Sequence, residues 1–177
     1  AIGCEATFVA RTVDVNQQHL AATLQRAAEH RGTSFVEIYQ NCVVFNDAAF
    51  GYATDRQTRD EATLVLEHGK PLVFGKDRDK GIRLRGLDPE IVALGNGVVE
   101  DDLLVHDERS PEPSLAYLLS RMRQPAFPEP IGVFRAVDRP QYDQRVNDQV
   151  AHAIEQQGVG DLDALFQSGD TWTVGPR

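Results

Sequence analysis

Two extended apolar segments separated by one amphipathic stretch constrain the fold of this chain more than any other feature. Residues 6–10 (Ala-Thr-Phe-Val-Ala) and residues 33–39 (Thr-Ser-Phe-Val-Glu-Ile-Tyr) are rich in the β-branched and aromatic side chains that favour strands. Between them, residues 17–30 carry apolar side chains at helical spacing, including Leu20 and Leu24. The order strand, helix, strand is that of a βαβ unit, so the sequence predicts two parallel strands joined by a right-handed crossover.

The ends of this predicted unit are marked by polar residues and glycine. Asp14, with Gln17 three residues later, has the spacing of a capping box, and Gly32 stands where a helix commonly ends. The second strand is followed by Gln40-Asn41-Cys42. Because open parallel sheets bind ligands beyond the carboxyl ends of their strands, Cys42 falls at a favoured position for a functional group.

Beyond Asp47 the pattern is less regular. Short apolar runs predict strands near residues 62–67, 71–74, 91–94, 103–105 and 131–137, and helical spacing returns at residues 114–122, 140–158 and 161–166. Residues 76–85 carry charges of both signs and are expected to form a solvated loop. We therefore expect an α/β fold in which residues 1–60 are the end of a doubly wound domain and residues 61–177 an irregular C-terminal extension.

Composition narrows the functional classes. The formal charge of −9 and a pI near 5.0 argue against sequence-independent nucleic-acid binding, and no apolar run is long enough to span a membrane. The first residues lack the basic start and long apolar stretch of a secretory leader, which favours a cytoplasmic, reducing compartment. Since the first residue is not Met and an apolar strand follows almost at once, we expect the segment to begin inside a larger polypeptide.

Few residue patterns carry chemistry by themselves. The sequence has no dinucleotide or phosphate-binding glycine motif, no Cys-x-x-Cys and no His-Glu-x-x-His, so no catalytic residue is assigned. The five histidines are dispersed, and the run His106-Asp107-Glu108 is expected to be a polar strand end, since consecutive strand residues point to opposite sides. Cys4 is expected to pack as a small apolar residue. Taken alone, Cys42 is expected to be a buried structural thiol, although its place after a strand also suits a functional group, and one thiolate cannot hold a metal cluster.

A longer stretch around Cys42 resembles a known family. Residues 32–47, Gly-Thr-Ser-Phe-Val-Glu-Ile-Tyr-Gln-Asn-Cys-Val-Val-Phe-Asn-Asp, closely resemble a segment of the β subunit of two-subunit 2-oxoacid:ferredoxin oxidoreductases, nearest to the bacterial 2-oxoglutarate type. Residues 6–11, 75–84 and 105–116 are similar to the same subunit. The most specific part is Gln40-x-Cys42 followed by Phe45-Asn46-Asp47.

The resemblance implies a function that the residue patterns alone do not. The family β subunit resembles a doubly wound thiamine-diphosphate-binding domain. These enzymes decarboxylate a 2-oxoacid, transfer the acyl group to coenzyme A and pass electrons through a [4Fe–4S] cluster to ferredoxin. In members that hold the cluster, its last cysteine ligand corresponds to Cys42. The α subunit of the same enzyme is the implied partner.

The chain also departs from the family pattern. The three other cluster cysteines and the Gly-Asp-Gly motif that binds magnesium and diphosphate are absent, so the chain resembles the C-terminal half of the subunit and is expected to be inactive alone. Val43 stands where the family usually has proline. The alternative hypothesis is a non-catalytic α/β module that packs on a partner subunit.

Overall fold

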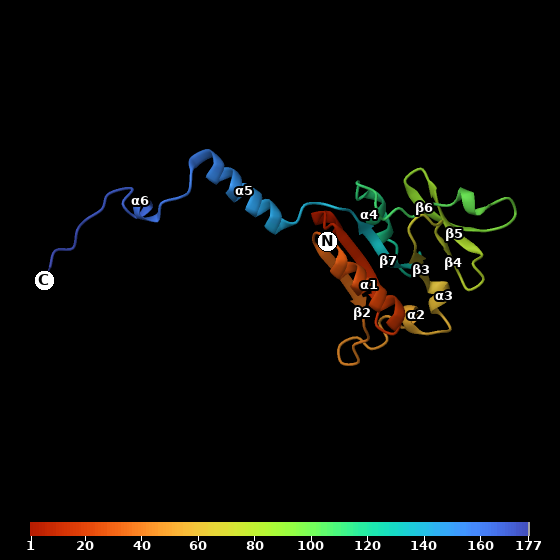
Figure 1. Ribbon diagram of the computed structural model, residues 1–177. Helices are drawn as coiled ribbons and strands as arrows, with labels where there is room; N and C mark the ends of the chain where they lie inside the picture. The colour runs from red at the N-terminus through yellow and green to blue at the C-terminus, as the bar shows by residue number, and fades with distance from the viewer. Residues whose placement is uncertain (177) are drawn as a thin grey trace. The chain divides into compact units, whose positions relative to one another are not determined.

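A computed structural model describes residues 1–176, which divide into two compact units (Figure 1). The first unit spans Ala1–Arg139 and the second begins at Pro140. Among the described residues only the first unit has a buried core, and its last buried side chain along the sequence is that of Val137.

The predicted βαβ unit is present. Strand β1 (Phe8–Val13), helix α1 (Gln17–Glu29) and strand β2 (Ser34–Tyr39) follow one another, and β1 and β2 pair in parallel from Phe8 opposite Ser34 to Val13 opposite Tyr39. The helix cap differs from the prediction. Asn16, not Asp14, is the N-cap, because its Oδ1 accepts a hydrogen bond from the backbone amide of His19 at 3.2 Å.

Strands from the second half of the sequence complete the main sheet. The order is β2-β1-β7-β3, with β7 (Glu129–Ala136) antiparallel to β1 and β3 (Thr63–Leu66) parallel to β7. The predicted α/β class is thus confirmed, with a mixed sheet. Gly132 lets β3 and β7 approach: a Cβ there would lie 2.8 Å from the carbonyl oxygen of Leu66, and its φ of +129° disfavours other residues.

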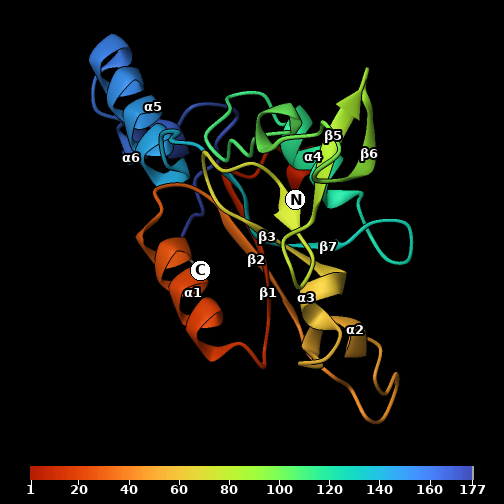
Figure 2. The same cartoon turned by 90° about the vertical axis from the view of Figure 1, so that its right-hand side faces the viewer.

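Elements cover both faces of this sheet, as Figure 2 shows. Helix α1 packs on one face, where Phe8, Ala10 and Val133 are buried. On the other face, α4 (Ser114–Ser120) contacts β7 within the largest buried cluster. That cluster comprises Ile2, Val9, Leu64, Leu66, Leu72, Phe74, Ile82, Ala116, Leu119, Met122 and Phe134. Alternate residues of β1 therefore serve opposite cores, as the period of a strand requires.

A second, antiparallel sheet contains the strands β4 (Val73–Phe74), β5 (Lys80–Arg85) and β6 (Asp88–Ala93). The prediction of a loop over residues 76–85 is wrong for β5, because this segment pairs with β4 and β6 and the side chain of Ile82 is fully buried. The remaining short helices are η1 (Ile2–Cys4), α2 (Gly51–Thr54), α3 (Arg59–Ala62) and η2 (Glu100–Asp102).

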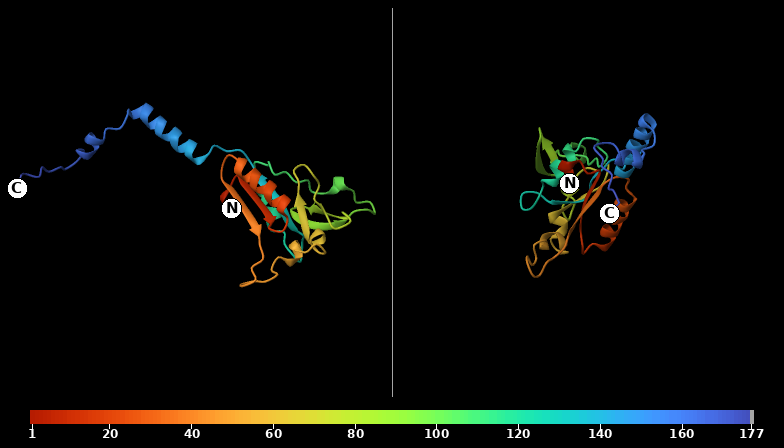
Figure 3. Two further views of the ribbon diagram at one scale, coloured as in Figure 1. Left: turned by 60° about the horizontal axis from the view of Figure 1, so that its bottom comes forward. Right: turned by 90° about the vertical axis from the view of Figure 1, so that its left-hand side faces the viewer.

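The second unit contains the two predicted helices, α5 (Tyr142–Gln157) and α6 (Leu162–Phe166), seen in Figure 3. Asp161 caps α6 as predicted, since its Oδ1 accepts hydrogen bonds from the amides of Asp163 and Ala164. The large apolar side chains of α5 are exposed to solvent, with exposed fractions from 36 % for Val146 to 84 % for Tyr142. Among residues 1–176, no helix is both long enough and apolar enough to cross a bilayer.

Candidate functional site: the Cys42 loop

Cys42 lies in a loop beyond the carboxyl end of an edge strand. Tyr39 is the last residue of β2, and residues 40–50, here termed the Cys42 loop, connect it to α2. The thiol of Cys42 is exposed. The structure therefore places Cys42 at the edge of the parallel pair where the sequence predicts a functional group.

Hydrogen bonds within the loop define its shape. The amide of Asn46 donates to the carbonyl of Cys42 at 2.9 Å, which closes a tight turn. The side chain of Asn41 bridges the turn, since its Nδ2 donates to Asp47 Oδ1 at 2.9 Å and its Oδ1 accepts from the amide of Ala48 at 2.8 Å. The sulfur of Cys42 is thus carried on a closed turn.

Backbone amides of this turn act on the sulfur. Interaction with the backbone amides of Phe45 and Val44, and to a lesser degree with that of Asn46, lowers the pKa of the Cys42 thiol. These amides come near the sulfur because the turn folds back on Cys42. An amide cradle of this kind stabilises an anionic sulfur, the form that binds a metal or acts as a nucleophile.

The Cys42 loop presents a single sulfur and an apolar tip. Val43, Val44 and Phe45 are 73 %, 78 % and 91 % exposed, so the tip of the loop is apolar. Across residues 1–176 no group of three or more His, Cys, Asp or Glu side chains is arranged to hold a metal ion. A cluster at Cys42 therefore requires cysteines from outside this part of the chain, while an exposed sulfur whose pKa is lowered by nearby amides fits that role.

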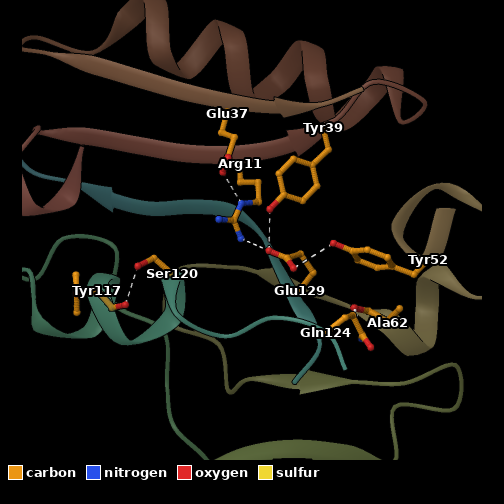
Figure 4. Close-up of polar contacts among 9 residues, drawn as sticks. All are labelled: Arg11, Glu37, Tyr39, Tyr52, Ala62, Tyr117, Ser120, Gln124 and Glu129. Carbon is orange, nitrogen blue, oxygen red and sulfur yellow. Dashed lines mark hydrogen bonds and ion pairs between the residues drawn. The ribbon is translucent and has the colours of Figure 1, made fainter. Parts of the chain in front are cut away.

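A buried carboxylate lies at the base of the Cys42 loop (Figure 4). Glu129, the first residue of β7, has only 4 % of its side chain exposed and forms an ion pair with Arg11 of β1. The same carboxylate accepts hydrogen bonds from the hydroxyl of Tyr39, to Oε1 at 3.0 Å, and from that of Tyr52, to Oε2 at 3.3 Å. Arg11 also donates from Nε to Glu37 Oε2 at 2.7 Å.

This network keeps its charges paired and its tyrosines protonated. Burial, together with the negative charge of Glu129, raises the pKa of Tyr52 to about 12, and the pKa of Tyr39 also rises, mainly through burial. The ring of Tyr39 stacks on Phe50 with a centroid distance of 4.1 Å. Both hydroxyls are therefore donors to Glu129 at neutral pH.

The other residues considered from sequence lie elsewhere. Cys4 is exposed in η1, so the expectation that it packs as an apolar residue is wrong; the one-turn helix leaves its side chain outside the core. His106 is fully buried, and its Nε2 bonds to the carbonyl of Val133 at 2.7 Å. The charged run contributes an exposed pair, in which Lys80 Nζ lies 2.5 Å from Glu61 Oε2 and lowers the pKa of that carboxyl.

Sequence reasoning missed Glu129 and its partners. The available signal was a single acidic residue within Phe127-Pro-Glu-Pro-Ile-Gly-Val-Phe134, an otherwise apolar stretch. A carboxylate in such a stretch is buried only when it is paired. Its partners could not be identified from sequence, because Arg11 lies 118 positions earlier in the chain.

Comparison with known proteins finds a similar oxidoreductase subunit. The chain is 36 % identical over 177 residues to the 2-oxoglutarate oxidoreductase subunit KorB of Mycobacterium tuberculosis. The match covers 98 % of this chain and 47 % of that relative, so the chain spans about half its length. No protein-family model matches. The resemblance to a 2-oxoglutarate-type oxidoreductase subunit is confirmed along almost the whole chain.

Proposed function

We propose that this chain is part of the β subunit of a 2-oxoacid:ferredoxin oxidoreductase that acts on 2-oxoglutarate. The observation that supports it most is the 36 % identity to subunit KorB over 98 % of the chain. The position of the exposed Cys42 just beyond the carboxyl end of β2 also supports it. In this proposal residues 1–60 end the thiamine-diphosphate-binding domain, residues 61–177 form the C-terminal extension, and the enzyme is cytoplasmic.

Cys42 is proposed as one ligand of a [4Fe–4S] cluster in the complete enzyme. Its sulfur is exposed and faces amide donors, which suits a thiolate that shares a cluster with three cysteines from outside this chain. Hydrogen bonds from the amides of Val44 and Phe45 to the sulfur favour the more negative, reduced cluster. The exposed side chains of Val43 and Phe45 would limit the access of water once another part of the enzyme covers the loop.

Thiamine diphosphate, held through magnesium, would supply the carbanion chemistry that decarboxylates the 2-oxoacid before acyl transfer to coenzyme A. The Gly-Asp-Gly motif expected to bind it does not occur in this sequence. No residue of this chain is therefore assigned to the diphosphate, and the isolated chain is proposed to be inactive. Ferredoxin accepts the electrons, and the α subunit completes the assembly.

Substrate oxidation by the complete enzyme tests the proposal. The full β subunit, co-expressed with its α partner, is expected to reduce ferredoxin in the presence of 2-oxoglutarate and coenzyme A, with lower kcat/KM for pyruvate. Ferredoxin reduction that does not depend on coenzyme A, or a preference for pyruvate, would contradict the assignment.

Cofactor binding by the isolated chain provides a separate prediction. Calorimetric titration of the 177-residue chain with thiamine diphosphate and magnesium is expected to show no binding, because the motif for the diphosphate is missing. The complete subunit serves as the positive control. Micromolar affinity of the isolated chain would mean that its own residues form the cofactor site.

A further inference from the structure

One carboxylate joins the two ends of the Cys42 loop. Tyr39 precedes the loop and Tyr52 follows it, yet both hydroxyls donate to Glu129, one to each oxygen. Figure 4 shows the two tyrosines approaching Glu129 from different elements, β2 and α2. Since β7 lies between β1 and β3 in the main sheet, Glu129 ties the loop to an interior strand.

The carboxylate is itself held in place. Arg11 pairs with Glu129, and its guanidinium lies 5.1 Å from the centre of the Tyr39 ring. Tyr39 in turn stacks on Phe50, the last residue of the loop. Arg11, Glu129 and the stacked rings of Tyr39 and Phe50 therefore form one connected set of contacts. Through these contacts the main sheet fixes the distance between the two ends of the Cys42 loop.

We propose that Glu129 is a positioning residue for Cys42, holding both ends of the loop through Tyr39 and Tyr52 so that its amides stay directed at the sulfur. The inference rests on the proposed function, in which that sulfur binds a cluster. Glu129 does not touch the cluster: it acts through the two hydroxyls and the turn between them. Loss of the hydroxyls lets the turn open and removes hydrogen bonds from the sulfur.

The test deletes the hydroxyls and keeps the rings. The double variant Tyr39→Phe/Tyr52→Phe retains the stacking on Phe50, and Tyr117→Phe is the matched control, since Tyr117 lies exposed on α4 outside the network. In the complete enzyme, hydrogen–deuterium exchange at residues 43–46 is expected to be about tenfold faster in the double variant and unchanged in the control. The cluster's reduction potential is expected to become more negative, with iron retained.

The outcomes separate the two proposals. Exchange and potential equal to those of Tyr117→Phe would overturn the role of Glu129, even if Cys42→Ser abolished iron binding. Faster exchange at residues 43–46 would support the positioning role even if Cys42→Ser retained its iron, which would contradict the cluster assignment instead. If the double variant does not fold, Tyr52→Phe alone frees one end of the loop while Tyr39 still bonds Glu129. Exchange at residues 43–46 is then expected to be faster than in Tyr117→Phe but by less than about tenfold, and unchanged exchange would overturn the positioning role.

Discussion

At the scale of single residues, the fold disfavours the charged form of three histidines in the first unit. His19 and His30 bond threonine hydroxyls, and His106 bonds a backbone carbonyl. Burial lowers the pKa of each ring. The unfolded chain therefore takes up protons first as the pH falls, so acid favours unfolding.

The free energy of unfolding is expected to fall between pH 7.5 and pH 5.5. The pKa values of these histidines in the folded state lie below the unfolded value of about 6.5. Protonation therefore costs the folded state no stability at a pH well above that value, and the loss of stability grows as the pH falls below it. Urea titrations of His106→Gln should show a weaker pH dependence than the unmodified chain. His152→Gln, on an exposed helix, should show the same pH dependence as the unmodified chain. A weaker pH dependence in His152→Gln than in His106→Gln would contradict the role given to the buried histidines.

At the scale of secondary-structure elements, α4 stabilises the first unit through one fully buried residue. Leu119 has no exposed area and packs in the main core. Leu119→Ala is expected to lower the free energy of unfolding by about 2–5 kcal/mol through lost burial and a residual cavity. Ile154→Ala in α5, where the side chain is 44 % exposed, should change it by less than about 0.5 kcal/mol. Equal effects of the two substitutions in chemical denaturation would contradict this difference.

The sequence predicts elements whose signals are local. The βαβ unit and helices α5 and α6 follow from apolar spacing and caps that lie within about 35 residues, and Cys42 could be placed because it directly follows β2. The pairing of β7 with β1 could not be predicted, because it joins segments more than a hundred residues apart. The role of Glu129 could not be predicted for the same reason, because it depends on this pairing of β7 with β1.

At the scale of the whole molecule, buried side chains are confined to the first unit. No residue from 140 to 176 is buried, whereas the core clusters draw on residues 2–134. A chain that ends at Arg139 is therefore expected to unfold cooperatively within about 2 °C of the full chain's midpoint, since no core area is removed. A decrease of about 10 °C in calorimetry would show that the second unit stabilises the first.

Iron content tests the central claim, that Cys42 ligates a cluster in the complete enzyme. The full β subunit would be prepared with its α partner as the unmodified protein, as Cys42→Ser and as Cys4→Ser, which removes the other exposed thiol. Iron and acid-labile sulfide per complex are then measured under anaerobic conditions. The account predicts that Cys42→Ser loses most of the cluster and of ferredoxin reduction, while Cys4→Ser retains both. Full iron in Cys42→Ser, or its loss in Cys4→Ser alone, would contradict it.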